Sequence, residues 1–297
     1  MRPAGWRLPA VRVACCAAPI RGGALVGESM HDLVTPASVM KIQVGLAALT
    51  AIHEGRLDGS SRVTLDTSTR TPGPVGMSLL RDPVQMSVRD LVVPMLTISD
   101  NVATDALIDL VGLGTINSTT QRLGLVDTHV ASDLRGMLDA LAVDAGFADF
   151  DHLVRHDPAV DGPPLAEEVG SRIASSAALD PHRWSRTTPA EAVRLLQALW
   201  TDVAGPPAVC AQLRRLMSQQ LRRSRIASGF GPDVAVAAKS GGLMGIVRNE
   251  VGVVTDRDGE AYAIAIFTQR PTASSVDSAQ IDQAIGALAN DLVQQLH

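Results

Sequence analysis

Two residues near the start of this 297-residue chain have the types and spacing needed for acyl transfer. In Ser38-Val39-Met40-Lys41 an amine follows a hydroxyl by three positions, so both lie on one face of a helix start and the amine can reach the hydroxyl. A serine hydroxyl is a weak nucleophile until a base takes its proton. A lysine can be that base when burial or a nearby cation lowers its pKa. We therefore predict that Ser38 is a nucleophile and Lys41 its base.

A second hydroxyl and an amide come from Ser99-Asp100-Asn101. We expect the Ser99 hydroxyl to pass a proton to the leaving nitrogen and the Asn101 amide to bind the amide of a substrate. All three residue types also favour helix N-caps, which is the simpler interpretation of the triplet.

The third group, Lys239-Ser240-Gly241, follows an apolar run that reads as a strand. Lys239 supplies a positive charge that could lower the pKa of Lys41, and Ser240 a hydroxyl for a substrate carboxylate. Gly241 and Gly242 allow a substrate backbone to approach closely. The backbone N–H groups of Ser38 and Gly242 would then form an oxyanion hole.

The elements that must position these groups follow from the hydrophobic pattern. Apolar residues from Ile42 to Ile52 recur at helical spacing and end at Gly55, which predicts a helix directly after Ser38. Val88–Ile98 and Val102–Val111 predict two helices that place Ser99-Asp100-Asn101 on the turn between them. Another helix is predicted over Ala190–Thr201, and a last one carries an apolar stripe from Ile281 to Leu296. The strand-like runs are Val11–Ile20, Gly23–Val26, Val234–Lys239, Arg248–Val254 and Ala261–Thr268.

Strands at both chain ends with helices between them predict an α+β fold. We expect an antiparallel sheet built from both chain ends with covering helices, plus an inserted all-helical lobe. Residues 1–28 and 228–297 are assigned to the sheet lobe, and residues 29–227 to the helical lobe. Residues 60–87 look like loop, and a long, partly irregular excursion is expected at about 133–186.

Composition narrows the class of partner. The formal net charge of −5 argues against nucleic acid, because phosphate binding needs a basic face. Arg214-Arg215, Arg222-Arg223 and Arg225 are interpreted as a solvated helix face and the loop after it. No apolar run approaches the length of a membrane span, so no membrane partner is expected.

Cysteine usage and the N-terminus favour a cytoplasmic location. Cys15, Cys16 and Cys210 form an odd set with an adjacent pair, a poor disulfide framework that indicates a reducing compartment. A secretory leader opening at Arg2 or Arg7 would need a longer apolar run than Arg12 and Arg21 leave.

With the three motifs in this order, the chain resembles the class A β-lactamase-like serine hydrolases, which are related to low-molecular-weight penicillin-binding proteins. The resemblance covers nearly the whole chain and includes Val92–Asn101 and Gly245–Val254 (GIVRNEVGVV). Ser240 stands where the family has threonine, so the hydroxyl is kept. The resemblance implies two lobes with the active site at their junction, and it implies that Arg248 binds the substrate carboxylate.

The chain departs from this family at the glutamate that activates the deacylating water. The family reads Glu-x-x-Leu-Asn, whereas this chain reads Arg135-Gly136-Met137-Leu138-Asp139, with Arg135 in the place of the glutamate. Asp139, Glu167 and Glu168 are possible replacement bases, although each is more often a solvated side chain. The resemblance therefore supports acylation and leaves deacylation without an assigned base.

The predicted function is a serine hydrolase that forms an acyl-enzyme on Ser38 with a β-lactam or a related amide or ester. One alternative is an esterase or D-Ala-D-Ala-peptidase-like enzyme with weak or no β-lactamase activity. Another is a non-catalytic protein that binds a β-lactam or other ligand. The expected partner is a small acyl substrate. We expect no cofactor and no metal, and the sequence does not indicate an oligomeric state.

Overall fold

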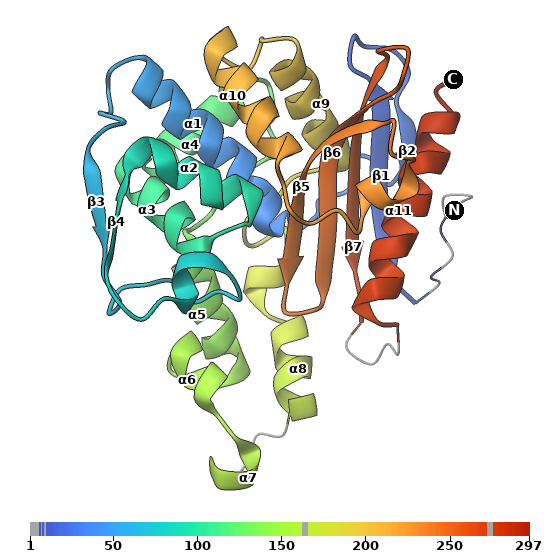
Figure 1. Ribbon diagram of the computed structural model, residues 1–297. Coiled ribbons are helices and arrows are strands. Elements are labelled where there is room, and N and C mark those ends of the chain that lie inside the picture. Colours follow the sequence, from blue (N-terminus) through green and yellow to red (C-terminus); the bar gives the residue numbers. More distant parts are fainter. Residues whose placement is uncertain (1–5, 7, 9, 162–165, 272–275) are drawn as a thin grey trace.

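The structure is a computed structural model that describes the chain except residues 1–5, 7, 9, 162–165 and 272–275. Figure 1 shows a sheet with one long helix on its outer side and a group of helices on the other. Arg2, Arg7 and the Gly162-Pro163-Pro164 part of the predicted excursion lie outside the described residues.

A five-stranded antiparallel sheet joins the two ends of the chain, in the order β2-β1-β7-β6-β5. The central strand, β7, is buried from Tyr262 to Thr268, because both faces of the sheet are covered. The prediction of an antiparallel sheet built from both chain ends is confirmed. The strands are β1 (Arg12–Pro19), β2 (Val26–Glu28), β5 (Ala235–Leu243), β6 (Val247–Thr255) and β7 (Ala261–Gln269).

Each face of the sheet packs on its own layer of helices. The apolar stripe of α11 (Ser278–Gln294) packs on Ile264 and Ile266, which point to one face of β7. Alternation along the strand directs Ala265 to the other face, where α9 (Pro189–Trp200) and the helical lobe lie. Burying one such large aliphatic side chain contributes about 1.5–3 kcal/mol, so these two layers fix the position of the sheet.

The second lobe is built around α1 (Lys41–His53), which is buried continuously from Lys41 to Leu49. This burial follows from its position, since other helices pack on several sides of it (Figure 1). The predicted helix after Ser38 is therefore the centre of the lobe. The helices around it are α2 (Val88–Thr97), α3 (Asn101–Val111), α4 (Leu113–Arg122) and α10 (Pro207–Ser218).

This lobe is not all-helical, which corrects the prediction. In the stretch expected to be loop, β3 (Arg62–Leu65) pairs with β4 (Val84–Ser87) as a separate two-stranded sheet. A 3-10 turn, η2 (Gly76–Leu79), lies between them. The strands are only four residues long, so their pattern is too short to stand out among the surrounding Thr, Gly and Pro residues.

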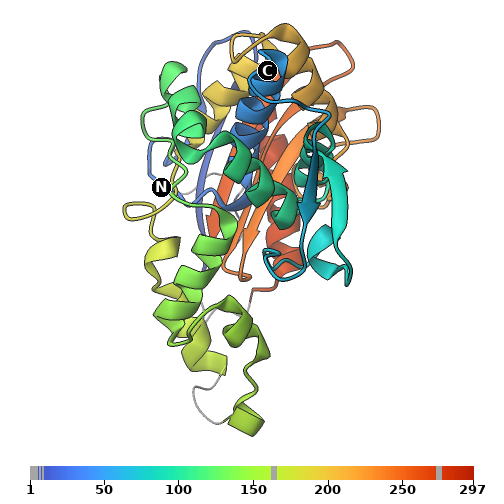
Figure 2. The ribbon, with the colours of Figure 1, turned by 90° about the vertical axis from the view of Figure 1, so that its left-hand side faces the viewer.

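The predicted long, partly irregular excursion consists of short helices joined by turns and irregular segments. Figures 1 and 2 both show its helices projecting from the body as an arm. Asp133 caps the first helix through the N–H of Gly136, and Gly146, with φ of 96°, ends it. The arm consists of α5 (Leu134–Ala145), α6 (Phe150–Arg155), α7 (Pro158–Asp161), α8 (Ala166–Ala174) and a 3-10 turn, η3 (Ala177–Leu179).

Within the described residues, every helix is too short or too polar to span a membrane. The boundaries between the two lobes at residues 28 and 228 stay a prediction.

Candidate active site

Ser38 lies on a 3-10 turn, η1 (Ala37–Met40), that leads directly into α1. The residue before it, Ala37, has φ of 48°, a left-handed conformation that costs a residue with a side chain about 1–3 kcal/mol. Such strain persists only where the surroundings hold the backbone. Here Asn249 of β6 donates from Nδ2 to the Pro36 carbonyl at 3.2 Å. The predicted nucleophile thus stands on a turn that is tied to the sheet.

The Lys41 amine, at the start of α1, is completely buried and points to the predicted relay. Its Nζ donates to the Ser99 carbonyl at 2.6 Å, to Ser99 Oγ at 3.2 Å and to Asn101 Oδ1 at 2.9 Å. Burial lowers the pKa of Lys41 to about 7, although the nearby carboxylates of Asp105 and Asp100 oppose this shift. At neutral pH a large fraction of this amine is therefore a free base.

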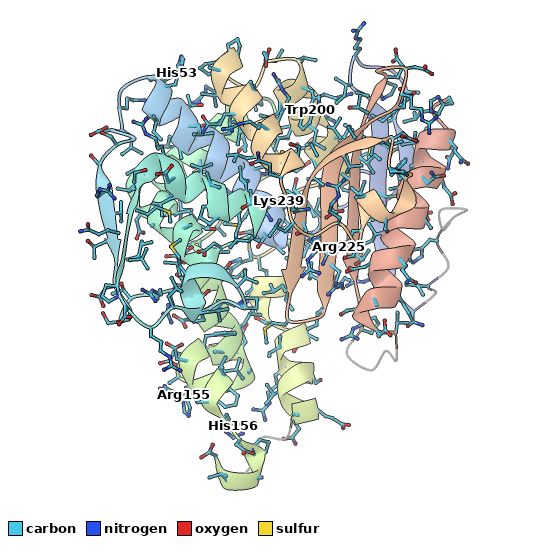
Figure 3. All side chains as sticks on the ribbon, viewed as in Figure 1. His53, Arg155, His156, Trp200, Arg225 and Lys239 are labelled. Carbon is cyan, nitrogen blue, oxygen red and sulfur yellow. The ribbon has the colours of Figure 1, made fainter. Side chains whose placement is uncertain are left out.

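Lys239 approaches the same hydroxyl from the sheet (Figure 3). Its Nζ donates to Ser99 Oγ at 3.0 Å and to the Ser240 carbonyl at 2.8 Å, and its side chain is completely buried. Burial and the neighbouring Lys41 lower the pKa of Lys239 well below its ordinary value. One serine hydroxyl therefore connects the two lysines that the sequence motifs indicated.

The turn that presents Ser99 is held by the residue after it. Ser99 has φ of 64°, and Asp100 caps α3 by accepting from the Ala103 N–H at 2.9 Å. The same carboxylate accepts from the Met77 N–H at 2.6 Å, and a Cβ at Gly76 would overlap it. The triplet thus has both of the roles considered from the sequence, a helix cap at Asp100 and a hydroxyl beside Lys41.

Asn101, the first residue of α3, has both ends of its amide engaged. Oδ1 accepts from Lys41, and Nδ2 donates to the Pro72 carbonyl at 2.8 Å. In this arrangement Asn101 positions the Lys41 amine. Its contact with a substrate amide stays a prediction.

We expected the strand to end at Lys239-Ser240-Gly241. Instead these residues lie inside β5, which continues to Leu243. β5 is an edge strand of the antiparallel sheet. In such a strand every second residue directs both its N–H and its C=O away from the neighbouring strand. The Ser240 N–H donates to Gln220 Oε1 at 2.5 Å, and the Ser240 carbonyl accepts from Lys239. Gly242, two residues on, therefore directs its N–H and carbonyl toward the same outer side.

Glycine at position 241 lets β5 pass close to the nucleophile. A Cβ at Gly241 would lie 2.7 Å from the Pro36 oxygen and 3.3 Å from the Ser38 nitrogen. The first distance is too short for any real Cβ contact, so no other residue fits without moving the backbone. The outer edge of β5 and the Ser38 N–H consequently lie side by side.

Arg248 lies on β6 opposite Gly242, on the same face of the sheet as Ser240. It makes a two-point pair with Asp282 of α11, at 2.8 Å from Nε and 2.7 Å from Nη2. Burial opposes the ionisation of Asp282, but hydrogen bonds from Arg248 and the charge of Arg225 hold its pKa below the ordinary value. The guanidinium is thus fixed beside the β5 edge, and its contact with a substrate carboxylate stays a prediction.

Arg225 is buried, which corrects its interpretation as part of a solvated basic loop. Its side chain lies between β5 and α11 (Figure 3), where Nε donates to Asp282 at 2.8 Å and Nη1 to the Gly241 carbonyl at 2.7 Å. A guanidinium has five N–H donors, so it can be buried where a carboxylate and carbonyls satisfy them.

Arg135, which stands where the family has its deacylating glutamate, lies in the first turn of α5. Its Nη2 donates to the Arg70 carbonyl at 2.5 Å and its Nη1 pairs with Asp151 at 3.1 Å. Asp139 accepts from the Phe150 N–H at 3.0 Å, inside the arm. Glu167 and Glu168 are exposed on α8, in the arm rather than beside Lys239 (Figures 1 and 3). The structure therefore does not bring these three carboxylates to the lysine pair.

Asp105 is a buried carboxylate whose charge raises the pKa of Lys41. This residue was not predicted from the sequence. It accepts from Thr71 Oγ1 at 2.6 Å, from the Leu134 N–H at 2.8 Å and from the Arg135 N–H at 2.9 Å. Burial raises the pKa of Asp105 to about 6, although these hydrogen bonds oppose the shift. Its position four residues after Asn101, on the same helix face, was a signal that could have identified it.

Comparisons with known proteins identify relatives of this chain. The chain matches the model of the β-lactamase enzyme family over residues 11–296. It is 31% identical over 245 residues to the β-lactamase regulatory protein BlaB of Streptomyces cacaoi, an alignment that covers 78% of this chain and 76% of that protein.

Solved structures share the fold. A β-lactamase from Sphaerobacter thermophilus has a TM-score of 0.74 at 24% identity, over 96% of this chain and 92% of that one. A variant of PBP-A, solved as an acyl-enzyme complex with penicillin G, has a TM-score of 0.73 at 19% identity, over 97% and 90%. These likenesses confirm the predicted α+β, β-lactamase-like fold. Since the family model matches nearly the whole chain, the chain belongs to the β-lactamase enzyme family.

Proposed function

We propose that Ser38 forms an acyl-enzyme with a β-lactam or a related amide or ester, and that the chain frees this acyl group slowly. The observation that carries the proposal is the Ser99 hydroxyl, which lies within hydrogen-bond distance of both Lys41 and Lys239. A nucleophile needs a base beside it, and a leaving group needs a proton donor. The Ser99 hydroxyl, beside the proposed base Lys41, can carry the proton from that base to the leaving group.

Acylation begins when Lys41, as a free base, takes the proton of Ser38. The Ser38 oxygen bonds to the acyl carbon, and the carbon–nitrogen or carbon–oxygen bond of the substrate breaks. The proton held by Lys41 passes through the Ser99 hydroxyl to the leaving atom, so charge and protons balance. Lys239 hydrogen-bonds to Ser99 and orients that hydroxyl.

The negative charge that develops on the acyl oxygen needs fixed donors. We assign this role to the Ser38 N–H and the outward N–H of Gly242, and the close approach of β5 at Gly241 to the Ser38 backbone supports the assignment. Loss of one such donor costs an acyl-transfer enzyme about 10²–10³ in rate. A hole made of backbone groups depends on the exact path of the strand.

Deacylation is the slow half of the proposed reaction. Arg135 is a permanent cation with no acceptor atom, so it cannot activate a water. Asp105 is occupied by three hydrogen-bond donors, two of them backbone N–H groups. Among the residues that the structure describes, none of the candidate carboxylates is both free and beside the lysine pair, so an acyl group on Ser38 should persist.

A second candidate is a ligand-binding protein in which the acyl-enzyme is a signal rather than a step in turnover. The regulatory description of BlaB favours it. This candidate uses the same acylated Ser38 and differs only in the fate of the acyl group. Esterase or peptidase-like activity also needs the same residues, so the test includes an ester.

The proposal is tested by intact-protein mass after exposure to penicillin G and, separately, to an activated aryl ester. The native chain should gain one acyl group, and Ser38→Ala should gain none. A native chain that reacts with neither compound, nor with any acyl amide, would contradict the proposed acylation of Ser38.

A further inference from the structure

A chain of buried side chains leads from the inside of the sheet to the backbone of Ser240. Glu250 is completely buried on β6, directly opposite Ser240 in the strand register. Its Oε1 accepts from Gln220 Nε2 at 3.1 Å, and Gln220 Oε1 accepts from the Ser240 N–H at 2.5 Å. No assigned step of acylation uses either side chain.

The carboxyl group of Glu250 helps to orient the Gln220 amide. Both Glu250 oxygens accept hydrogen bonds here, so the NH₂ end of Gln220 faces Glu250. The oxygen end is then left for the Ser240 N–H. The NH₂ group also donates to the Arg222 carbonyl at 3.0 Å, which favours the same orientation.

The second oxygen of Glu250 binds a segment that contacts Gly241, the residue after Ser240 on β5. Oε2 accepts from the Ile226 N–H at 2.7 Å, at the start of η4 (Ile226–Gly229). The residue just before it, Arg225, donates to the Gly241 carbonyl. One carboxylate is therefore connected to two consecutive residues of the edge, Ser240 and Gly241.

A buried carboxylate is costly unless its oxygens are hydrogen-bonded, so Glu250 is an unusual choice for a strand interior. Burial raises the pKa of Glu250, and the charge of Arg225 and the two hydrogen bonds oppose this shift. An aliphatic side chain would fill the space without that cost. The carboxylate offers what an aliphatic residue lacks, two acceptors in fixed directions.

We propose that Glu250 is a positioning residue for the substrate-binding edge, acting through Gln220 and Ile226 on Ser240 and Gly241. Holding these residues sets where the Gly242 N–H and carbonyl meet an acyl substrate. This inference rests on the proposed acylation of Ser38 for its effect on rate, but the hydrogen-bond chain can be tested without it.

Glu250→Gln is a nearly isosteric change that breaks the chain of donors and acceptors. If the new amide oxygen stays on the Ile226 N–H, its NH₂ faces the NH₂ of Gln220. If Gln220 then turns over, its NH₂ faces the Ser240 N–H instead. In either arrangement two donors oppose each other in a buried place.

The exchanged pair Gln220→Glu with Glu250→Gln restores the donors and acceptors that link Ser240, positions 220 and 250, and Ile226, although the Arg222 carbonyl loses the donor that it has in the native chain. The carboxylate at position 220 accepts from the Ser240 N–H and from the NH₂ of the amide at position 250. The oxygen of that amide accepts from the Ile226 N–H. Glu260→Gln, an exposed glutamate in the β6–β7 turn, is the matched control.

Two readouts decide the proposal: the rate of Ser38 acylation by penicillin G, and the hydrogen-exchange rate of the Ser240 amide measured by NMR. Glu250→Gln should lower the acylation rate about tenfold and raise the exchange rate of the Ser240 amide by a similar factor. This is the effect expected of one unsatisfied buried donor. The exchanged pair should move both rates back toward the native values, short of full recovery because the Arg222 carbonyl has lost its donor, and Glu260→Gln should change neither.

Native values in Glu250→Gln, or an exchanged pair no closer to them than Glu250→Gln is, would overturn the proposal. If Glu250→Gln does not fold, the exchanged pair still decides, since it must fold and keep the Ser240 amide protected from exchange. A native chain that no acyl reagent modifies would reject the proposed function, whereas the exchange series would still test Glu250.

Discussion

Lys41 and Lys239 donate to the same hydroxyl, that of Ser99, at 3.2 and 3.0 Å. Both amines are completely buried, and they come from different lobes, α1 and β5. Two ammonium groups on one acceptor repel each other in a medium that screens poorly. The pair therefore favours a state in which at most one of the two amines is a charged ammonium group. The other amine is then neutral and free to act as a base.

The rate of Ser38 acylation should rise with pH, with a midpoint near 7. The active form of Lys41 is the free base, which is populated above its pKa of about 7, so the rate increases as protons are lost. The measurement is the initial rate of adduct formation by intact mass across this range. A midpoint near the ordinary lysine value of about 10.4 would show that Lys41 is not the base.

Ser99→Ala should slow acylation by about 10²-fold or more, because proton transfer to the leaving atom loses its relay. The rate of adduct formation on Ser38 is again the measurement. Ser118→Ala is the control, since that exposed hydroxyl donates to the Gly114 carbonyl of its own helix, α4. Equal rates for Ser99→Ala and the control would remove Ser99 from the mechanism.

Arg135→Glu should shorten the life of the acyl-enzyme by at least about tenfold, because it returns a general base to this position. The backbone N–H of residue 135 donates to Asp105, whose charge acts on Lys41, so the site of the change is close to the lysine pair. Decay of the adduct is followed by mass after free penicillin is removed. Arg135→Gln separates the effect of a base from loss of the arginine, and equal decay in both variants would refute the prediction.

Gly241→Ala should impair acylation more than it impairs folding. The new Cβ would meet the Pro36 oxygen at 2.7 Å and push β5 away from the Ser38 turn. We expect a stability loss of about 1–3 kcal/mol by thermal unfolding, as for other overpacked sites, together with a larger relative loss of acylation rate. Gly170→Ala is the control, because a Cβ at that helical position meets nothing within 4 Å. Native acylation by Gly241→Ala would show that the close approach is not needed.

The sequence predicted the parts of the site that rest on local spacing. Ser38 and Lys41 lie where a helix start puts them, and Ser99 lies on a turn between two helices whose apolar patterns are long enough to recognise. The sheet was also predictable, because each of its long strands contains a stretch of at least four consecutive apolar residues, with glycine counted among them.

The parts that depend on distant partners were not predictable in the same way. Arg225 is indistinguishable from the exposed arginines beside it until Asp282, from the last helix, and the Gly241 carbonyl are placed around it. The Arg248 pair with Asp282 and the Gln220 contact with Ser240 likewise join segments far apart in the chain. The helices of the arm could not be bounded from the sequence because they are short and are interrupted by Pro and Gly, so helical periodicity does not accumulate.

The lifetime of the adduct on Ser38 is the sharpest test of fast acylation combined with slow release. The native chain is saturated with penicillin G, free penicillin is removed, and intact mass is followed with time, with Ser38→Ala as the control. We predict one acyl group on the native chain, none on Ser38→Ala, and an adduct that outlasts the removal of free penicillin. A rapid return to the unmodified mass with release of hydrolysed penicillin would contradict slow release, because another residue would then supply the missing base.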